Sequence, residues 1–185
     1  MLYEFSKHSH PISAICFIND QIASFDSSGT IIITTGVSSA VTSNNSLPCV
    51  RLKGIAYTDV KYIHSKNGII GVGNPEGRGR LDLADLQNRR CSSKLLLTEK
   101  IYNIELSFDE KLVFLNLSSM TIHAYTTSKF KLSFQVVGYQ QAHCLMRMSV
   151  GGSNKDVLAV TSEEGCVCLY SIKKKALIKK VKGMS

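Results

Sequence analysis

The sequence predicts an all-β protein made of about four successive small sheets, each with four antiparallel strands. Three observations predict this fold class. Short runs rich in β-branched and aromatic residues recur along the chain, and glycine, serine and aspartate separate them. The same order of runs and turns returns roughly every 45 residues. The runs lack the apolar spacing of three and four residues that helical repeats need.

The first repeat shows the order of elements most clearly. Apolar runs at residues 12–17 and 21–25 precede a turn at residues 26–29, and the run at residues 30–34 follows. A short turn of aspartate, serine and glycine between two apolar runs is typical of a hairpin. We therefore expect strand, short loop, strand, tight hairpin and strand.

Three later repeats keep this order. Their second strands align when Ala23, Ile70, Phe114 and Ala159 are placed in register. The glycine-rich stretch at residues 73–79 takes the place of the hairpin in the second repeat. The runs are residues 57–63, 68–72 and 80–83 in the second repeat, 102–108, 111–115 and 120–125 in the third, and 143–150, 156–161 and 166–170 in the fourth.

A fourth strand is expected to close each repeat, at residues 49–53, 94–98, 129–136 and 176–182. A small twisted sheet cannot cover both of its faces alone, so we expect the sheets to stack as blades of a β-propeller. The chain would form one domain over residues 1–185, as a ring of four blades, as part of a longer protein, or as a partial propeller that a partner subunit completes. The expected blades are residues 10–53, 56–98, 101–136 and 142–182, after a leftover outer strand within residues 1–9.

The first repeat resembles a WD40 repeat. The resemblance lies in the segment at residues 10–17, followed by Ile22, Ala23, Ser24 and the turn that begins at Asp26. It implies that His10, Ser24 and Asp26 supply three members of the family's structural hydrogen-bond network. The chain has no tryptophan, and the tryptophan position of the network falls at Ile33 or a neighbour. The resemblance covers nearly the whole chain by period, and the first and fourth repeats by local sequence.

Composition indicates an intracellular protein. No apolar run approaches the roughly 20 residues of a membrane-spanning helix. The first residues lack the basic region, apolar core and cleavage site of a secretory signal. The six cysteines have no zinc-site or thioredoxin-like spacing, and we expect free thiols, with Cys166 and Cys168 on one face of a strand. The expected location is the cytoplasm or the nucleus.

The net charge of +8 suggests an anionic partner as one possibility. Two groups of basic residues are candidates for binding an anion or a partner. One group would form a basic rim near the glycine-rich hairpin, and the other is the lysine-rich last repeat, where lysines also protect an exposed edge strand. The candidates are Arg78, Arg80, Arg89 and Arg90 in the first group, and Lys173, Lys174, Lys175, Lys179 and Lys180 in the second.

Candidate catalytic chemistry is weak throughout the sequence. The glycine-rich stretch at residues 71–80 has the amides of a phosphate-binding loop, but a strand-like run follows it instead of a helix. The five histidines stand apart without metal spacing, and no serine lies in a nucleophile elbow. We therefore expect no catalytic residues, no metal and no cofactor.

The expected function is a non-catalytic scaffold for protein–protein interaction within an intracellular complex. One alternative is a basic module that binds RNA or phosphoinositides, for which binding would weaken steeply with salt. A second alternative is an enzyme on a propeller scaffold, which would need polar groups that converge only in the folded chain.

Overall fold

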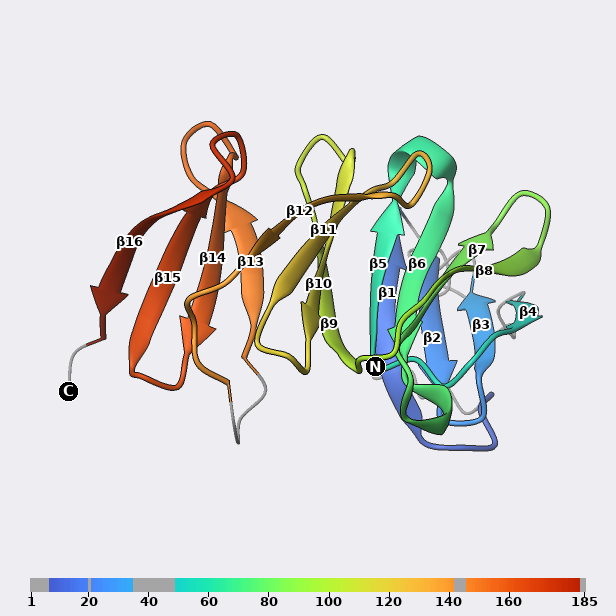
Figure 1. Cartoon of the computed structure of the whole chain (residues 1–185). Coiled ribbons are helices and arrows are strands. Elements are labelled where there is room, and N and C mark those ends of the chain that lie inside the picture. The colour runs from blue at the N-terminus through green and yellow to red at the C-terminus, as the bar shows by residue number, and fades with distance from the viewer. Residues whose placement is uncertain (1–6, 20, 35–48, 142–145, 184–185) are drawn as a thin grey trace, which may run out of the picture. The chain divides into compact units, whose positions relative to one another are not determined.

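The computed structural model describes residues 7–19, 21–34, 49–141 and 146–183. In this part of the chain sixteen strands form four antiparallel sheets, and the four strands of each sheet are neighbours in chain order (Figure 1). Helical structure among these residues is limited to two short 3₁₀ turns, η1 (His64–Lys66) and η2 (Pro75–Gly77). The prediction of an all-β fold with four four-stranded sheets is confirmed.

The strands divide into two compact units, and each unit contains two sheets. The first unit holds β1–β8, and the second holds β9–β16 with the short turn at residues 77–79. The first sheet is β1 (Ile12–Ile18), β2 (Gln21–Asp26), β3 (Thr30–Thr34) and β4 (Cys49–Lys53), and the second is β5 (Asp59–Ile63), β6 (Gly68–Gly73), β7 (Arg80–Asp85) and β8 (Arg90–Leu96). The third sheet is β9 (Ile101–Leu106), β10 (Leu112–Leu117), β11 (Ile122–Thr126) and β12 (Leu132–Val136), and the fourth is β13 (Met148–Gly151), β14 (Val157–Ser162), β15 (Cys166–Ser171) and β16 (Ala176–Lys182).

The core of the first unit lies between its two sheets. Alternation along the strands places Ala23 and Phe25 of β2 on the same face as Ile31 and Ile33 of β3. Tyr57, from the loop before β5, enters the same core, and its ring meets that of Phe25 edge to face at 5.6 Å between centroids. The two sheets therefore bury one face of each against the other.

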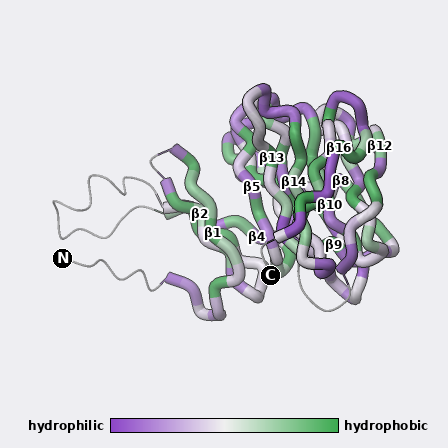
Figure 2. Tube along the Cα trace, turned by 90° about the vertical axis from the view of Figure 1, so that its left-hand side faces the viewer, coloured by the Kyte–Doolittle hydropathy of each residue, from purple (hydrophilic) through white to green (hydrophobic). Residues whose placement is uncertain are grey.

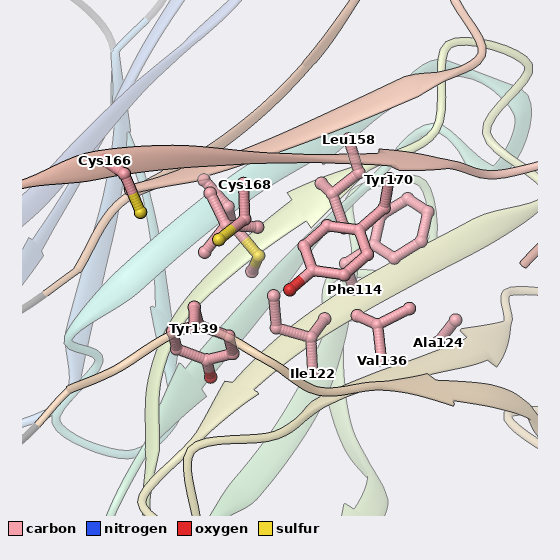
Figure 3. Packing of buried hydrophobic residues seen from close by; sticks show 11 residues of the cluster. Phe114, Ile122, Ala124, Val136, Tyr139, Leu158, Cys166, Cys168 and Tyr170 are labelled. Carbon is pink, nitrogen blue, oxygen red and sulfur yellow. The ribbon is translucent and has the colours of Figure 1, made fainter. Parts of the chain in front are cut away.

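The second unit repeats this arrangement with its own core (Figure 3). Phe114 of β10 and Ile122 of β11 contribute from the third sheet, and Leu158, Cys168 and Tyr170 contribute from the fourth. Cys166 and Cys168 are both buried and lie in this core, so the prediction that they share one face is confirmed. Two sheets that stack face to face bury apolar side chains that neither sheet could cover alone.

An irregularity recurs in the pairing of the third and fourth strands. The register shifts between Leu81 and Asp82 in the second sheet and between Ala124 and Tyr125 in the third. A third shift falls between Leu169 and Tyr170. Bulges of this kind bend a strand and increase its twist. The outermost strand of each of these three sheets therefore bends, just after the equivalent residues Ala124 and Leu169 in the third and fourth sheets and earlier along the strand in the second.

Most predicted strands agree with the structure within a few residues, and the differences have local causes. Strand β5 begins at Asp59 rather than at residue 57 because Tyr57 turns into the core. Strand β8 begins at Arg90 rather than at residue 94 because the preceding turn is tight. Asn88 closes that turn by donating to the Asp85 carboxylate from its backbone N–H at 2.9 Å and from Nδ2 at 2.8 Å.

Two predictions fall partly on residues outside the described ranges. The proposed outer strand at residues 2–5 lies entirely outside them, and so does the beginning of the run at residues 143–150. The described part of that run forms β13 from Met148. No helix in the described residues has the length and hydrophobicity that crossing a membrane would require.

Candidate interaction surfaces

A hydrogen-bonded cluster in the first sheet contains two of the three residues that the WD40 resemblance implied. Ser24 and Asp26 both contact one histidine, but this histidine is His8 and not His10. The distances are 2.8 Å from His8 Nδ1 to Asp26 Oδ2 and 2.7 Å from His8 Nε2 to Ser24 Oγ. His10 is exposed and contacts the neighbouring Ser9 instead, so its assignment is corrected.

Asp26 is the centre of this cluster and is almost fully buried. Its Oδ1 accepts hydrogen bonds from Ser28 Oγ at 2.7 Å, Ser28 N at 2.9 Å and Thr30 N at 3.0 Å. Burial by itself raises the pKa of Asp26, but the hydrogen bonds from Ser28, His8 and Thr30 outweigh it and hold the pKa far below its usual range. The carboxylate therefore ties the β2–β3 hairpin to the segment that precedes β1.

Next to Ile33, where the resemblance placed the tryptophan of the network, Ile32 contacts the cluster through its backbone. Ser24 is paired with Ile32 across β2 and β3, and Ser24 Oγ donates to the Ile32 carbonyl at 3.4 Å. Ile32 is buried, but it offers no side-chain donor. The cluster thus joins the side chains of His8, Ser24 and Asp26, and Ser24 also contacts the backbone of Ile32.

The four candidate arginines do not form one basic rim. Arg80 begins β7, whereas Arg90 pairs with Asp85 at the other end of that strand, so the two are about 17 Å apart along it. Arg78 lies in the turn before β7, and Arg89 lies in the turn before β8. Arg80 is also engaged already, because its Nε donates to Asp82 Oδ1 at 2.7 Å. The predicted rim is wrong.

The glycine-rich stretch is a strand–turn–strand segment, as predicted, and its glycines serve close packing. A Cβ on Gly71 would lie 2.5 Å from the Tyr57 ring, and a Cβ on Gly73 would collide with the Ala56 carbonyl. In the second unit, a Cβ on Gly79 would collide with the Glu99 carbonyl. These glycines let neighbouring backbone and the Tyr57 ring approach closely, which explains their frequency without a bound phosphate.

The lysine-rich segment is exposed throughout and follows the outer edge of the fourth sheet. Lys173, Lys174 and Lys175 form the turn between β15 and β16, and Lys179 and Lys180 lie on β16. Lys180 Nζ contacts Glu164 Oε2 at 2.9 Å. Lysines on an edge strand oppose pairing with another strand, and this role fits their position as well as anion binding does.

The fourth sheet has one covered face and one uncovered face. Cys166, Cys168 and Tyr170 of β15 belong to the core of the second unit. Val167 and Leu169 alternate with them, face the other way and remain only half-buried. Ala159 of β14 and Val181 of β16 lie on this same face, and Val181 is 42% exposed. We call Val157, Ala159, Val167, Leu169 and Val181 the outer face of the fourth sheet.

The first sheet also exposes large apolar side chains. Ala14 and Cys16 of β1 pack against the core of the first unit, whereas Ile15 and Phe17 alternate with them and point away from it. Phe17 is 70% exposed. Figure 2 shows hydrophobic stretches along β1 and β2. Large exposed apolar side chains next to each other are typical of surfaces that bind other proteins.

Two buried polar clusters were missed by the sequence analysis. In the first unit, Tyr57 Oη donates to Asp82 Oδ2 at 3.0 Å, and Asp82 is fully buried. In the second unit, Tyr139 Oη donates to Asn116 Oδ1 at 2.6 Å. Both tyrosines lie in the loop that precedes a first strand, as His8 does. A polar ring residue at this place in the first, second and fourth repeats is the signal that would have revealed them.

The remaining chemistry-bearing side chains are dispersed. Within the described ranges, no group of three or more histidine, cysteine, aspartate or glutamate side chains could hold a metal ion. Five cysteines in these ranges are free thiols, as predicted, and burial raises the pKa of Cys16 to about 12. The geometry that can be described therefore consists of packing clusters, an uncovered sheet face and basic turns.

A scan against protein-family models gave no match to this chain, and a search of curated protein sequences gave none either. The fold thus defines the class of protein: an all-β chain with four antiparallel four-stranded sheets in two compact units.

Proposed function

We propose that this protein is a non-catalytic scaffold for protein–protein interaction, built as a WD40-like β-propeller or part of one. It acts as a subunit of an intracellular multiprotein complex in the cytoplasm or nucleus. The observation that carries this proposal is the outer face of the fourth sheet, which is apolar but only half-buried.

The strand register shows which faces correspond between sheets. On the outer face, Ala159 pairs with Leu169 across β14 and β15. The pairs at the same place in the first and third sheets are buried in the cores that those sheets share with the next sheet along the chain. These covered pairs are Ala23 with Ile33 and Phe114 with Ala124.

The outer face therefore carries apolar side chains like those on the buried faces of the first and third sheets, but its own side chains on β14 and β15 stay half-buried. Apolar groups at its centre gain about 25 cal/mol for each Å² removed from water, so a second sheet stacked on it would be stabilised by the same effect that holds each unit together. Ser149 and Lys179 lie beside the apolar centre and supply a polar rim. We propose that the occupant is a four-stranded sheet of another protein subunit.

The cluster of His8, Ser24 and Asp26 supports a WD40-like interpretation of the blades. It joins the segment before the first strand, the second strand and the following hairpin, as the family's network does. The missing tryptophan marks the repeats as divergent.

The test places a photo-crosslinking amino acid at Ala159 in the tagged chain, expressed in its native cells. We expect it to capture one stoichiometric protein, with the cross-linked peptide lying in a β-sheet of that protein. Leu169→Glu puts a charge at the centre of the outer face and should lower recovery of this partner about tenfold or more, since a buried unpaired charge costs well over 1.4 kcal/mol.

The matched control is Leu132→Glu, which adds the same charge to an exposed leucine on β12. It should leave recovery unchanged, and thermal melts should show that both variants fold. Equal recovery with Leu169→Glu and the original chain would contradict the proposal. Capture of a second copy of this chain would replace the partner subunit with self-association.

The alternative function is anion binding through the exposed lysines of the turn at residues 173–175 and of β16. One observation favours it: three consecutive lysines stand together without a described ion pair to a carboxylate. Recovery of RNA, with loss after nuclease and a steep fall with salt, would support this alternative over the scaffold.

A further inference from the structure

A cavity of ≈ 660 Å³ opens on the second unit. It lies between the turn that joins β9 to β10, the turn that joins β13 to β14 and the turn that joins β15 to β16. Figure 1 shows these three turns at the same end of their sheets. We call this cavity the turn groove.

The floor of the turn groove is apolar. Leu112 and Ile172 line it and pack against the core of the unit from its margin. Phe108 forms a wall and is 65% exposed, although an aromatic ring in a turn is costly to leave in water. A large apolar side chain from outside could contact all three residues at once.

The rim of the turn groove is predominantly basic. Lys155 Nζ lies 3.2 Å from the centroid of the Phe108 ring, and Lys173 lines the opposite turn and is exposed. Lys111 also lines the groove but is engaged by Asp109 at 3.3 Å. Three lysines thus face two aspartates, Asp109 and Asp156, and the next residues, Lys174 and Lys175, add further positive charge.

Asp109 is committed to holding its own turn. It accepts hydrogen bonds from Ser107 Oγ at 2.8 Å and from Lys111 N at 3.1 Å. The hydrogen bond from Ser107 is the main reason that the pKa of Asp109 lies below its usual range. Its charge is therefore largely compensated locally, whereas the Lys155 ammonium lies against the Phe108 ring and Lys173 lies in an exposed turn.

The walls of the turn groove are held in place by backbone hydrogen bonds. Ile172 N donates to the Asp156 carbonyl at 2.8 Å and ties two of the turns together. Leu112 N donates to Ser107 Oγ at 2.9 Å, and Lys155 N donates to the Gly152 carbonyl at 3.0 Å. A site with braced walls loses little conformational freedom when a ligand binds.

We propose that the turn groove binds an acidic peptide segment of a partner protein, with one large apolar side chain seated on Phe108, Leu112 and Ile172. The acidic side chains that flank this anchor lie against Lys155 and Lys173. A peptide fits better than a nucleic acid, because the aliphatic floor of Leu112 and Ile172 suits a large apolar side chain, whereas successive bases stack on several aromatic rings and Phe108 is the one aromatic residue among those that line the groove. The inference rests on the proposed scaffold function and assigns it a second, separate contact.

The test measures fluorescence anisotropy of labelled nonapeptides mixed with the whole chain. The probe has a central leucine flanked by glutamates, and two matched peptides carry lysines in place of the glutamates or a serine in place of the leucine. We expect only the acidic leucine peptide to bind. Phe108→Ala and Lys155→Glu should each weaken binding about tenfold or more.

Lys94→Glu is the matched control, because it reverses the same charge on an exposed residue of β8 outside the groove. It should leave the affinity unchanged. Equal binding of the lysine-flanked peptide, or no effect of Phe108→Ala and Lys155→Glu, would overturn the inference. Tighter binding of a single-stranded oligoribonucleotide than of the acidic peptide would overturn it in favour of a nucleic-acid site.

Failure here is distinguishable from failure of the scaffold proposal. Leu169→Glu alters the outer face and should leave peptide affinity unchanged. Phe108→Ala should leave the cross-link from Ala159 unchanged. If only Leu169→Glu has its expected effect, on recovery of the partner, the outer-face contact exists and the turn-groove contact does not. If only Phe108→Ala has its expected effect, on peptide affinity, the reverse holds.

Discussion

At the residue scale, His8 and Asp26 join two parts of the chain that are 18 residues apart in sequence. His8 lies before β1, and Asp26 ends β2. The imidazole contacts both the Asp26 carboxylate and the Ser24 hydroxyl, so it can bridge the two only in one ring orientation. Its removal would leave a buried carboxylate with one partner fewer.

We predict that His8→Ala lowers the free energy of unfolding by about 1–3 kcal/mol, the cost of losing a hydrogen bond to a charged, buried group. Urea denaturation followed by circular dichroism measures this change. His10→Ala is the control, because His10 is exposed and its ring contacts the neighbouring Ser9, so its effect should stay within roughly 0.5 kcal/mol. A larger effect of His10→Ala would contradict the assignment of His8.

The lowered pKa of Asp26 predicts a dependence of stability on pH. The folded chain holds this carboxyl deprotonated at pH values where the unfolded chain, with a pKa of about 3.9, takes up a proton. The stabilisation is therefore complete above about pH 5 and is lost as the pH falls through the unfolded and folded pKa values.

Denaturation of the original chain and of Asp26→Asn should be compared from about pH 6 down to about pH 2. The difference in unfolding free energy should be greatest at the higher pH and shrink as the solution becomes acidic. Asp85→Asn serves as a control for an exposed turn carboxylate, whose loss should matter less. A difference that stays constant with pH would show that Asp26 titrates normally.

The sequence predicted Ser24 and Asp26 of this cluster but named the wrong histidine. Both His8 and His10 precede β1, and distance along the chain alone does not show which side chain reaches the hairpin. The bend at residues 9–10 and the register shift between Ile12 and Ala14 decide it. Both depend on the folded backbone and have no distinct residue pattern.

At the scale of elements, the loop before a first strand repeatedly brings a polar ring into contact with a sheet. Tyr57 does so over β6, where Gly71 provides the space for its ring. The phenol then reaches the buried Asp82 carboxylate, which also receives Arg80. A glycine in the middle of a strand is unfavourable in itself, so its presence at residue 71 is explained by this contact.

We predict that Gly71→Ala destabilises the first unit by about 1–3 kcal/mol, because the new methyl group would overlap the Tyr57 ring. The measurement is the midpoint of chemical denaturation. Gly151→Ala is the control on β13, since a Cβ at that position would meet no atom within 4 Å. Equal effects of the two substitutions would mean that Tyr57 moves aside at little cost.

A strand was easy to predict from the sequence where one face of the strand is buried, and difficult to predict where both of its faces are exposed. Short runs of apolar, mostly β-branched or aromatic residues bounded by turn residues made β2, β3 and β15 evident from the sequence. The outermost strands gave weaker patterns, and every residue of β16 is exposed. The buried clusters around Asp82 and Asn116 were unpredictable for another reason, because their members lie 25 and 23 residues from the tyrosines that contact them.

At the scale of the whole molecule, each unit has a core of its own. Phe25 and Phe114 occupy comparable depths in the cores of the first and second units, and both are almost fully buried. A substitution in the core of one unit removes contacts within that unit and none within the core of the other unit. Local opening should therefore follow the units.

We predict that Phe114→Ala lowers the stability of the second unit by about 3–5 kcal/mol. Native-state hydrogen exchange should then show faster exchange in β9–β16 and nearly unchanged exchange in β1–β8. Phe25→Ala is the reciprocal variant and should show the opposite pattern. Uniform acceleration along the chain with either variant would mean that the two units open as one.

The half-buried outer face of the fourth sheet also has a consequence for the life of the protein in the cell. On the scaffold proposal, a subunit made in excess of its partner would present this apolar surface to chaperones and proteases, which act on exposed hydrophobic segments and change abundance several-fold. Its steady-state level should then follow the rate at which the partner is synthesised. The exposed Val181 and its neighbours would act as a degradation signal that assembly conceals.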